Sequence, residues 1–339
     1  MQEIEPASSR ATVRYLLIAT KIALSAGLIY YAFSRIDLHE AWSQMRNIAA
    51  FAVIATMMIL FLEMVVASVR LRQILAMLGP QCRFVQALDV VFIGAFFSQT
   101  LISFVGGDAM RIWRIVRSNV SLGVAARGVV LDRVSGLAGL LVLVVVTLPF
   151  LLQLVTDPAM RLGLMAALIG GVGGFAVLAS FNYLPDTLRR LRFLHWIAEL
   201  AAAAMSVTRS MQDIAVLLGL SLAIHVLNVA IIYVLAVGLS VDLTFWHCLL
   251  LAPPVMFLSM LPISVAGWGV REGAMIVALG LVGVTPAQSV ALSICFGLGV
   301  LAISLPGGLL WLLHRGEYAI AQSEPRLGAT GKRARGSNR

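Results

Sequence analysis

SFVGGDAMR, residues 103–111, interrupts a long apolar run with two glycines and then places one acid and one arginine. A second stretch, PISVAGWGVREG at residues 262–273, repeats this arrangement in the later half of the chain. A helix that ends among glycines and charges at lipid depth needs protein or water around it, because hydrocarbon cannot satisfy free backbone groups. Paired broken segments in the two halves of a chain indicate a transporter's binding site. We therefore expect two hairpins that contribute to one polar site.

The composition places the chain among helical membrane proteins. Its 339 residues are 60% hydrophobic and only 12% charged, whereas soluble domains carry about 25% charged residues. The apolar runs are continuous and do not alternate, which argues against a transmembrane β-barrel. The composition therefore predicts a polytopic α-helical bundle.

The charge and the cysteines exclude several other classes. The formal net charge is +9, but arginines between membrane spans are ordinarily topology signals and contacts to anionic lipids, so we expect no nucleic-acid partner. Three scattered cysteines form neither a disulfide framework nor a metal-ligand pair. Metalloprotease, nucleotide-loop and nucleophile-elbow motifs are also missing from the sequence. We expect no cofactor, no metal and no enzyme activity.

The chain divides into three regions. Residues 1–13 form a cytoplasmic N-terminus, residues 14–313 form the membrane domain, and residues 314–339 form a basic cytoplasmic tail that we expect to be disordered. We expect residues 15–33 to be a retained signal anchor, because the run is long enough to span, and residues 182–212 to form an interfacial amphipathic helix. The apolar segments are 15–33, 48–69, 84–105, 134–155, 162–181, 213–238, 245–285 (broken near its middle) and 287–313.

The arginines predict the topology. Loops 70–83 and 106–133 are both basic and should both be cytoplasmic. Segment 84–105 lies between them, so we expect it to enter from the cytoplasm and return, and segment 245–285 to do the same from outside. The outer side then carries only Arg35, Arg46, Arg161 and Arg271 of the 25 Lys and Arg residues, and Lys21 lies within a span.

The predicted fold is an all-α polytopic membrane bundle with two opposed re-entrant helical hairpins, related as a pseudo inverted repeat. It has six full spans, and both termini are cytoplasmic. Eight plain spans are the alternative, but they would leave a strongly basic loop outside.

The first motif is typical of an anion site. Gly106 and Gly107 free the backbone to turn and to approach a ligand closely, and we expect Asp108 to be the N-cap of the helix that follows. Arg111 lies three residues later on the same helix face. A helix start beside arginines binds anions, and in a membrane the anion is a lipid phosphate. The alternative is that Asp108 only caps the helix and Arg111 only marks the inner interface.

The second motif combines a helix end with a helix start. Pro262 ends one helix, Gly267 and Gly269 allow a tight turn, and Arg271 and Glu272 open the next helix. Adjacent residues do not share a helix face, so we expect Arg271 and Glu272 to contact different partners. A purely structural ion-pair latch is the alternative.

Charges from the two motifs can pair if the hairpins meet, because buried charges need partners. The candidate pairs are Arg271 with Asp108, and Glu272 with Arg111. If the tips of the two hairpins meet, they would form a single water-filled pocket from both halves of the chain.

At these residues the chain resembles the flippase-like family defined by the membrane domain of lysylphosphatidylglycerol synthase. The family's glycine-glycine-aspartate motif with a following arginine corresponds to Gly106-Gly107-Asp108 and Arg111. Its proline-glycine motif ending in arginine-glutamate corresponds to Pro262 through Glu272, and its acid-arginine pair resembles Asp132-Arg133. The likeness covers about residues 14–313 and departs from the family at Ile102, where proline is usual.

The resemblance implies an inner-membrane flippase for a lipid with a polar head: an aminoacyl-phospholipid, a polyprenyl-phosphate glycolipid or a hopanoid. Its partners would be that lipid, anionic phospholipids at the cytoplasmic face and lipid-biosynthesis enzymes. The alternatives are a membrane-embedded polyprenyl-lipid transferase, with Asp108 or Glu272 as its acid, and a non-catalytic envelope scaffold. The expected substrate-binding residues are Gly106, Gly107, Asp108, Arg111, Asp132, Arg133, Gly267, Gly269, Arg271 and Glu272, with Pro262 structural.

Overall fold

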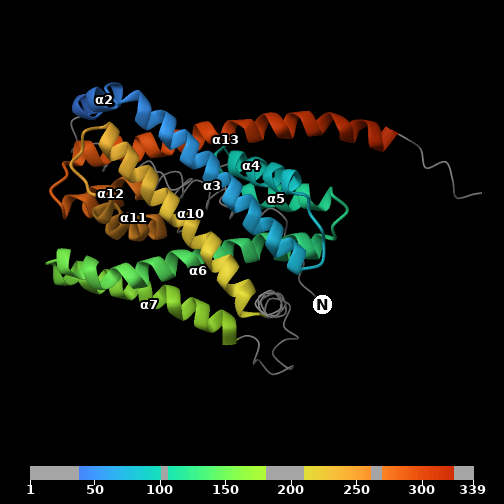
Figure 1. The fold of residues 1–339 in the computed structure, drawn as a ribbon, viewed down its shortest axis with the longest axis horizontal. Coiled ribbons are helices and arrows are strands. Elements are labelled where there is room, and N and C mark those ends of the chain that lie inside the picture. The colour runs from blue at the N-terminus through green and yellow to red at the C-terminus, as the bar shows by residue number, and fades with distance from the viewer. Residues whose placement is uncertain (1–37, 101–105, 181–209, 261–268, 324–339) are drawn as a thin grey trace, which may run out of the picture.

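The computed structural model describes residues 38–100, 106–180, 210–260 and 269–323, and every regular element within them is an α-helix (Figure 1). The predictions for residues 15–33 and 182–212, and those for Pro262 and Gly267, lie outside the described residues. The helices are α2 (Leu38–Arg46), α3 (Ala50–Met77), α4 (Phe84–Thr100), α5 (Gly106–Val116), α6 (Leu122–Leu154), α7 (Pro158–Ser180), α10 (Met211–Gly238), α11 (Phe245–Ser259), α12 (Val270–Gly280) and α13 (Pro286–Ser323).

Four of the described helices are long and apolar enough to span a membrane: α3, α6, α10 and the Pro286–Leu313 part of α13. They confirm the predicted segments 48–69, 134–155, 213–238 and 287–313 as span-length helices. Large apolar side chains such as Phe51, Met58 and Leu309 are exposed on them, as expected where the solvent is hydrocarbon. Helix α13 continues to Ser323, so the start of the tail expected to be disordered is helical.

Helices α3 and α10 form the central pair and run antiparallel. At one end, the Ala49 amide donates to the Gly238 carbonyl at 3.0 Å, and a Cβ added to Gly238 would overlap the side chain of Ala52. At the other end, Arg70 of α3 binds Ser221 of α10. The close approach at Gly238 is what glycine permits in a helix interface.

Helices α4 and α5 form a hairpin, but its arms differ from the prediction that residues 84–105 alone would enter and return: α4 is one continuous helix, and the returning arm is α5, in the stretch predicted as a loop. Three pairs of neighbouring residues connect the two helices: Asp89 with Arg114, Gly94 with Arg111, and Ser98 with Gly107. From one pair to the next the residue number rises on α4 and falls on α5, so the two helices are antiparallel. Residues 101–105 connect them. Helix α4 is short of the length of a full span, as a hairpin requires.

Two details of the first motif were predicted wrongly. Helix α5 already begins at Gly106, so Gly106 and Gly107 lie in its first turn, and Asp108 follows in that turn and is not the N-cap. A Cβ on Gly107 would lie 2.6 Å from the carbonyl oxygen of Gly94. Gly107 therefore serves the packing of α5 on α4 and does not form a turn.

The second half repeats the order of the first half in the opposite orientation. The series α3, α4, α5, α6 is a span-length helix, two short helices and another span-length helix, and α10, α11, α12, α13 is the same series. Because α3 and α10 are antiparallel, the two series are inverted. Figure 1 shows α4 and α5 toward one end of the bundle and α11 and α12 toward the other. The predicted all-α membrane bundle is thus confirmed, and the repeated order of its helices is the one that a pseudo inverted repeat predicts.

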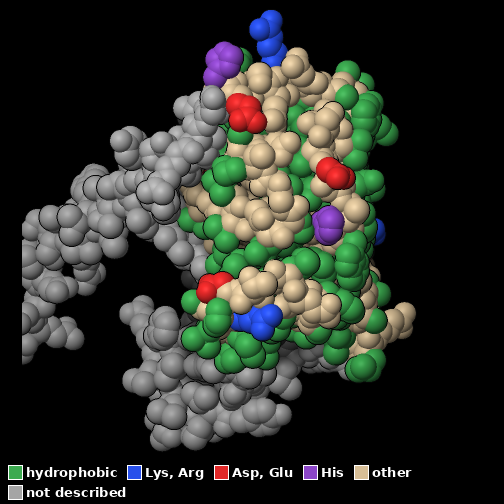
Figure 2. Space-filling view, turned by 90° about the vertical axis from the view of Figure 1, so that its left-hand side faces the viewer, with side chains coloured by type: hydrophobic (Ala, Val, Ile, Leu, Met, Phe, Trp, Pro, Cys, Tyr) green, Lys and Arg blue, Asp and Glu red, His purple; other side chains and the backbone are tan. Residues whose placement is uncertain are grey.

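The two ends of the bundle differ in charge. Exposed arginines at the end where α3 leads into α4 and α5 leads into α6 include Arg72, Arg83 and Arg117. Among the described residues, few Lys and Arg side chains lie at the opposite end (Figure 2). By the positive-inside rule, we expect the arginine-rich end to face the cytoplasm.

Cysteine labelling tests this orientation. In a variant without the native cysteines, Gln81→Cys and Ser118→Cys flank the first hairpin, and both positions are exposed. We expect both to react with a membrane-impermeant maleimide from the cytoplasmic side only, and the exposed control Asp242→Cys, beyond α10, from the outer side only. Reaction of positions 81 and 118 from opposite sides would mean that the α4–α5 segment crosses the membrane.

Candidate functional site

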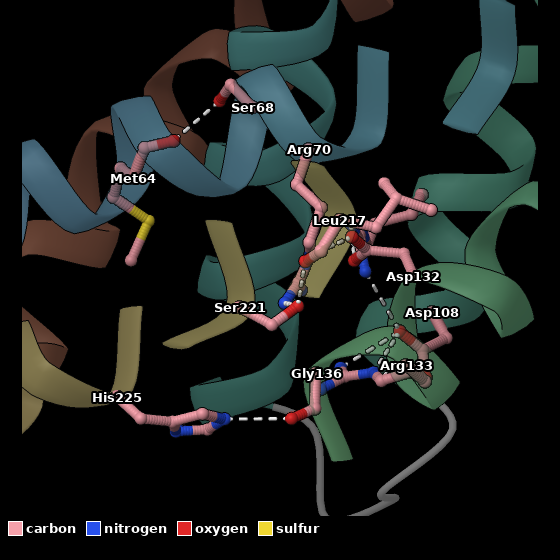
Figure 3. A network of polar contacts seen from close by, with 11 residues as sticks. Met64, Ser68, Arg70, Asp108, Asp132, Arg133, Gly136, Leu217, Ser221 and His225 are labelled. Carbon is pink, nitrogen blue, oxygen red and sulfur yellow. Dashed lines mark hydrogen bonds and ion pairs between the residues drawn. The ribbon is translucent and has the colours of Figure 1, made fainter. Parts of the chain in front are cut away.

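Asp132 of α6 is the centre of a buried charged cluster (Figure 3). Its carboxylate accepts from Arg70 Nε of α3 at 2.8 Å and from Arg111 Nη2 of α5 at 2.7 Å. The three residues are between 3% and 7% exposed. Buried charges persist only when paired and hydrogen-bonded, so Asp132 fixes the two guanidinium groups and joins three helices.

The cluster extends to α10. Arg70 Nη1 donates to Ser221 Oγ at 3.1 Å, and the Ser221 hydroxyl donates to the Leu217 carbonyl at 2.8 Å. One turn along α10, His225 Nε2 lies 2.8 Å from the carbonyl oxygen of Gly136 (Figure 3). A Cβ on Gly136 would lie 3.2 Å from Arg70 Nη1. The missing side chain at Gly136 therefore leaves room for the Arg70 guanidinium.

Asp108 and Arg133 form the outer part of the cluster. Arg133 Nε lies 3.0 Å from both carboxylate oxygens of Asp108, and Arg133 Nη2 lies 2.9 Å from Oδ1. Arg111 Nη1 is farther from Asp108 Oδ1, at 3.7 Å. The Arg133 side chain is 45% exposed and that of Asp108 is 18% exposed. Asp108 is thus held mainly by an arginine that reaches the surface of the cluster.

Arg111 is buried with incomplete hydrogen bonding. Its Nε has no hydrogen-bond partner among the described residues. A Cβ on Gly94 would lie 2.6 Å from the Cδ of Arg111, so the missing side chain at Gly94 leaves room for the aliphatic part of Arg111. The carboxylates of Asp132 and Asp108 face this buried guanidinium at 2.7 and 3.7 Å. Three arginines face two acids here, which leaves one surplus positive charge.

The second motif forms a separate cluster on α12 and α13. Glu272 is 1% exposed and accepts from the Gly269 amide at 2.5 Å, from Arg271 Nη2 at 2.8 Å and from Ser293 Oγ at 3.0 Å. The Arg271 guanidinium also lies 5.6 Å from the ring centroid of Phe296. Gly269 has φ of +86°, a conformation that favours glycine, which confirms the predicted turn there.

Three expectations for the charges differ from the structure. Arg271 and Glu272 bind each other, because the long guanidinium stem reaches back to the acid at the start of the helix. The cross-pairs of Arg271 with Asp108 and of Glu272 with Arg111 are not among the ion pairs of the described residues. Among the described residues, the charges of the two hairpins therefore form two separate clusters. The hairpin tips that were expected to share a pocket, residues 101–105 and 261–268, lie outside the described residues.

Sequence reasoning missed Arg70, Ser221 and Ser293 as members of these clusters. Arg70 was assigned to a basic loop, but α3 continues to Met77 and buries it. The available signal was the helical run beyond residue 69, since no proline or glycine stops it before Gly79. Ser221 and Ser293 had no local signal, because a serine in an apolar helix usually bonds to its own backbone.

No group of three or more His, Cys, Asp or Glu in the described part of the chain could hold a metal ion. The family model described as the lysylphosphatidylglycerol synthase TM region matches residues 18–308. This range contains both hairpins and both charged clusters. A comparison with curated proteins gives no match.

Proposed function

The chain belongs to the lysylphosphatidylglycerol synthase TM region family, and on this premise we propose that it is an inner-membrane transporter that moves a lipid with a phosphate-containing polar head between leaflets. The family and the span-length helices support a lipid-related function in a membrane. The transport step and the choice of lipid are our proposal.

The observation that carries the proposal is the surplus charge around Arg111. A guanidinium offers a planar fork of donors that matches the oxygens of a phosphate. The buried Nε of Arg111 has no acceptor among the described residues, and the amides in the first turn of α5 add a partial positive charge. A phosphate beside Arg111 and Arg133 would supply the missing acceptor and balance the charge.

The remaining residues of the cluster position these two arginines. Asp132 binds Arg111 directly, and Arg70 binds the same carboxylate group. Asp108 binds Arg133 through both carboxylate oxygens, so a phosphate would compete with Asp108 for Arg133. The lipid tails would stay in the bilayer, and only the head would need a polar path. The inverted hairpins provide the two related halves that alternating access uses.

A reconstitution experiment tests the proposal. Proteoliposomes would carry, in separate batches, headgroup-labelled phosphatidylglycerol, lysyl-phosphatidylglycerol or a polyprenyl-phosphate sugar, and a membrane-impermeant reagent would report the fraction in the outer leaflet. We expect at least one lipid to change leaflet faster than in protein-free liposomes. Equal rates for all three would contradict transport of phosphate lipids. A new lipid product in the same samples would instead favour a transferase.

A further inference from the structure

An apolar groove lies between α6, α7 and the second hairpin. Its volume is about 340 Å³, within the range of about 300–1,000 Å³ typical of ligand sites. Side chains from α6 form its floor, α7 forms one wall, and α11 and α12 form the other. Its lining includes Leu141 and Val144, Gly163 and Ala167, and Phe257 and Val277.

The groove faces the space that a bilayer would fill. None of the side chains of α7 between Pro158 and Gly174 is buried, so α7 is a peripheral wall. On the opposite wall, Val277 is 57% exposed and Leu258 is 37% exposed. The groove is closed near Gly171, where an added Cβ would lie 3.3 Å from Phe257 Cζ. An apolar groove that opens to hydrocarbon fits an alkyl chain.

A cation lies at the other end of the groove. Arg161 is three residues before Leu164 and seven before Leu168, both groove residues, so all three share a face of α7. Its Nε donates to the Val155 carbonyl at 2.6 Å and its Nη2 to the Leu152 carbonyl at 3.1 Å. These bonds hold the guanidinium at the C-terminal end of α6, where the helix dipole favours a positive charge.

The Arg161 end of the groove is distant from the cluster around Arg111. Asp132 and Leu154 are 22 residues apart on α6, which corresponds to about 33 Å along the helix. This distance is about the thickness of a bilayer's hydrocarbon core. Arg161 therefore lies at the membrane surface opposite the cluster, at the level of the headgroups of the other leaflet.

We propose that this groove is a binding site for a phospholipid of the leaflet opposite the arginine cluster, with one acyl chain in the groove and the phosphate at Arg161. An anionic phosphate complements the guanidinium at the mouth, and an acyl chain complements the apolar lining. The site does not depend on transport, because a phospholipid bound there can be resident or in transit. Surrounding lipid tails are as apolar as the groove, so its selectivity comes from packing and from the phosphate contact.

Photolabelling of the full chain in phosphatidylglycerol vesicles tests the site. The probe is phosphatidylglycerol with a diazirine in one acyl chain, and labelled peptides are mapped by mass spectrometry. The filling variant is Gly163→Leu, because a Cβ at Gly163 meets nothing within 4 Å and the longer side chain can extend into the groove. We expect labelling of the groove residues to fall about fivefold.

The matched control is Gly170→Leu, the same change on the same helix at an exposed position that is not part of the groove lining, and it should label as the wild type does. A second filling variant, Ala167→Trp, repeats the test should Gly163→Leu fail to fold. Equal groove labelling in the wild type and both filling variants would show ordinary annular lipid and overturn the proposal.

Arg161→Gln tests the phosphate contact separately. It should lower labelling by the phosphatidylglycerol probe but not by a diacylglycerol probe with the same acyl chain. Equal effects on both probes, or none on either, would remove the phosphate from the site. Because the readout is labelling, a failure here is distinguishable from a failure of lipid transport.

Discussion

Arg111→Ala is expected to lower lipid translocation by about a hundredfold or more. Hydrogen bonds to charged groups contribute about 1.5–3 kcal/mol each, and the loss of two such bonds to a phosphate corresponds to about a hundredfold. The fold should persist, because Arg70 Nε still binds Asp132 at 2.8 Å. The measurement is the leaflet-exchange rate in proteoliposomes, together with the melting temperature of the purified variant.

Two further variants sharpen the test. Arg117→Ala removes an exposed arginine just beyond the same helix and should leave the rate unchanged. Arg111→Lys keeps the charge but loses the planar fork, so its rate should fall between the rates of the wild type and Arg111→Ala. Wild-type exchange by a folded Arg111→Ala variant would remove the cluster as the headgroup site.

The fold was largely predictable because its signals are local. Continuous apolar runs predict helices, and a run broken by glycines and charges predicts a hairpin wherever hydrocarbon would otherwise face free backbone groups. The basic stretches 70–83 and 106–133 added the expectation that residues 84–105 return to their starting side, whereas the structure places the returning arm, α5, within the second stretch. The same signals did not predict the first turn of α5 correctly, since Gly106 and Gly107 permit a turn as well as a tight helix contact.

The pairing of charges was not predictable, because it depends on how distant helices cross. Asp132 and Arg70 are 62 residues apart and meet only when α3 packs on α6. Gly94 and Gly136 look like ordinary helix glycines in the sequence, yet each leaves room for an arginine of the cluster. The motif residues Asp108, Arg111, Asp132 and Arg133 were identified, and the structure adds that they form one cluster with Arg70 and Ser221.

The largest loss of stability is expected for Asp132→Leu. This change leaves Arg70 and Arg111 buried without their shared carboxylate, and removing one partner of a buried ion pair costs about 3–5 kcal/mol. The half-exposed pair of Arg133 with Asp108 should contribute only about 0–1 kcal/mol, so Arg133→Ala is the matched control. The free energy of unfolding in mixed detergent micelles measures both.

A double variant distinguishes the lost ion pair from lost packing. Replacing Arg70 by methionine in Asp132→Leu removes one of the two buried charges that lost Asp132 as a partner, and apolar replacement of a buried pair is often neutral or stabilising. Arg70→Met with Asp132→Leu should therefore be more stable than Asp132→Leu alone. In the double variant Arg111 keeps only the longer ion pair with Asp108, at 3.7 Å, so recovery should be partial. Translocation should stay low because Asp132 no longer positions Arg111. If the double variant were the less stable of the two, Asp132 would act through packing and not as the counter-ion of the cluster.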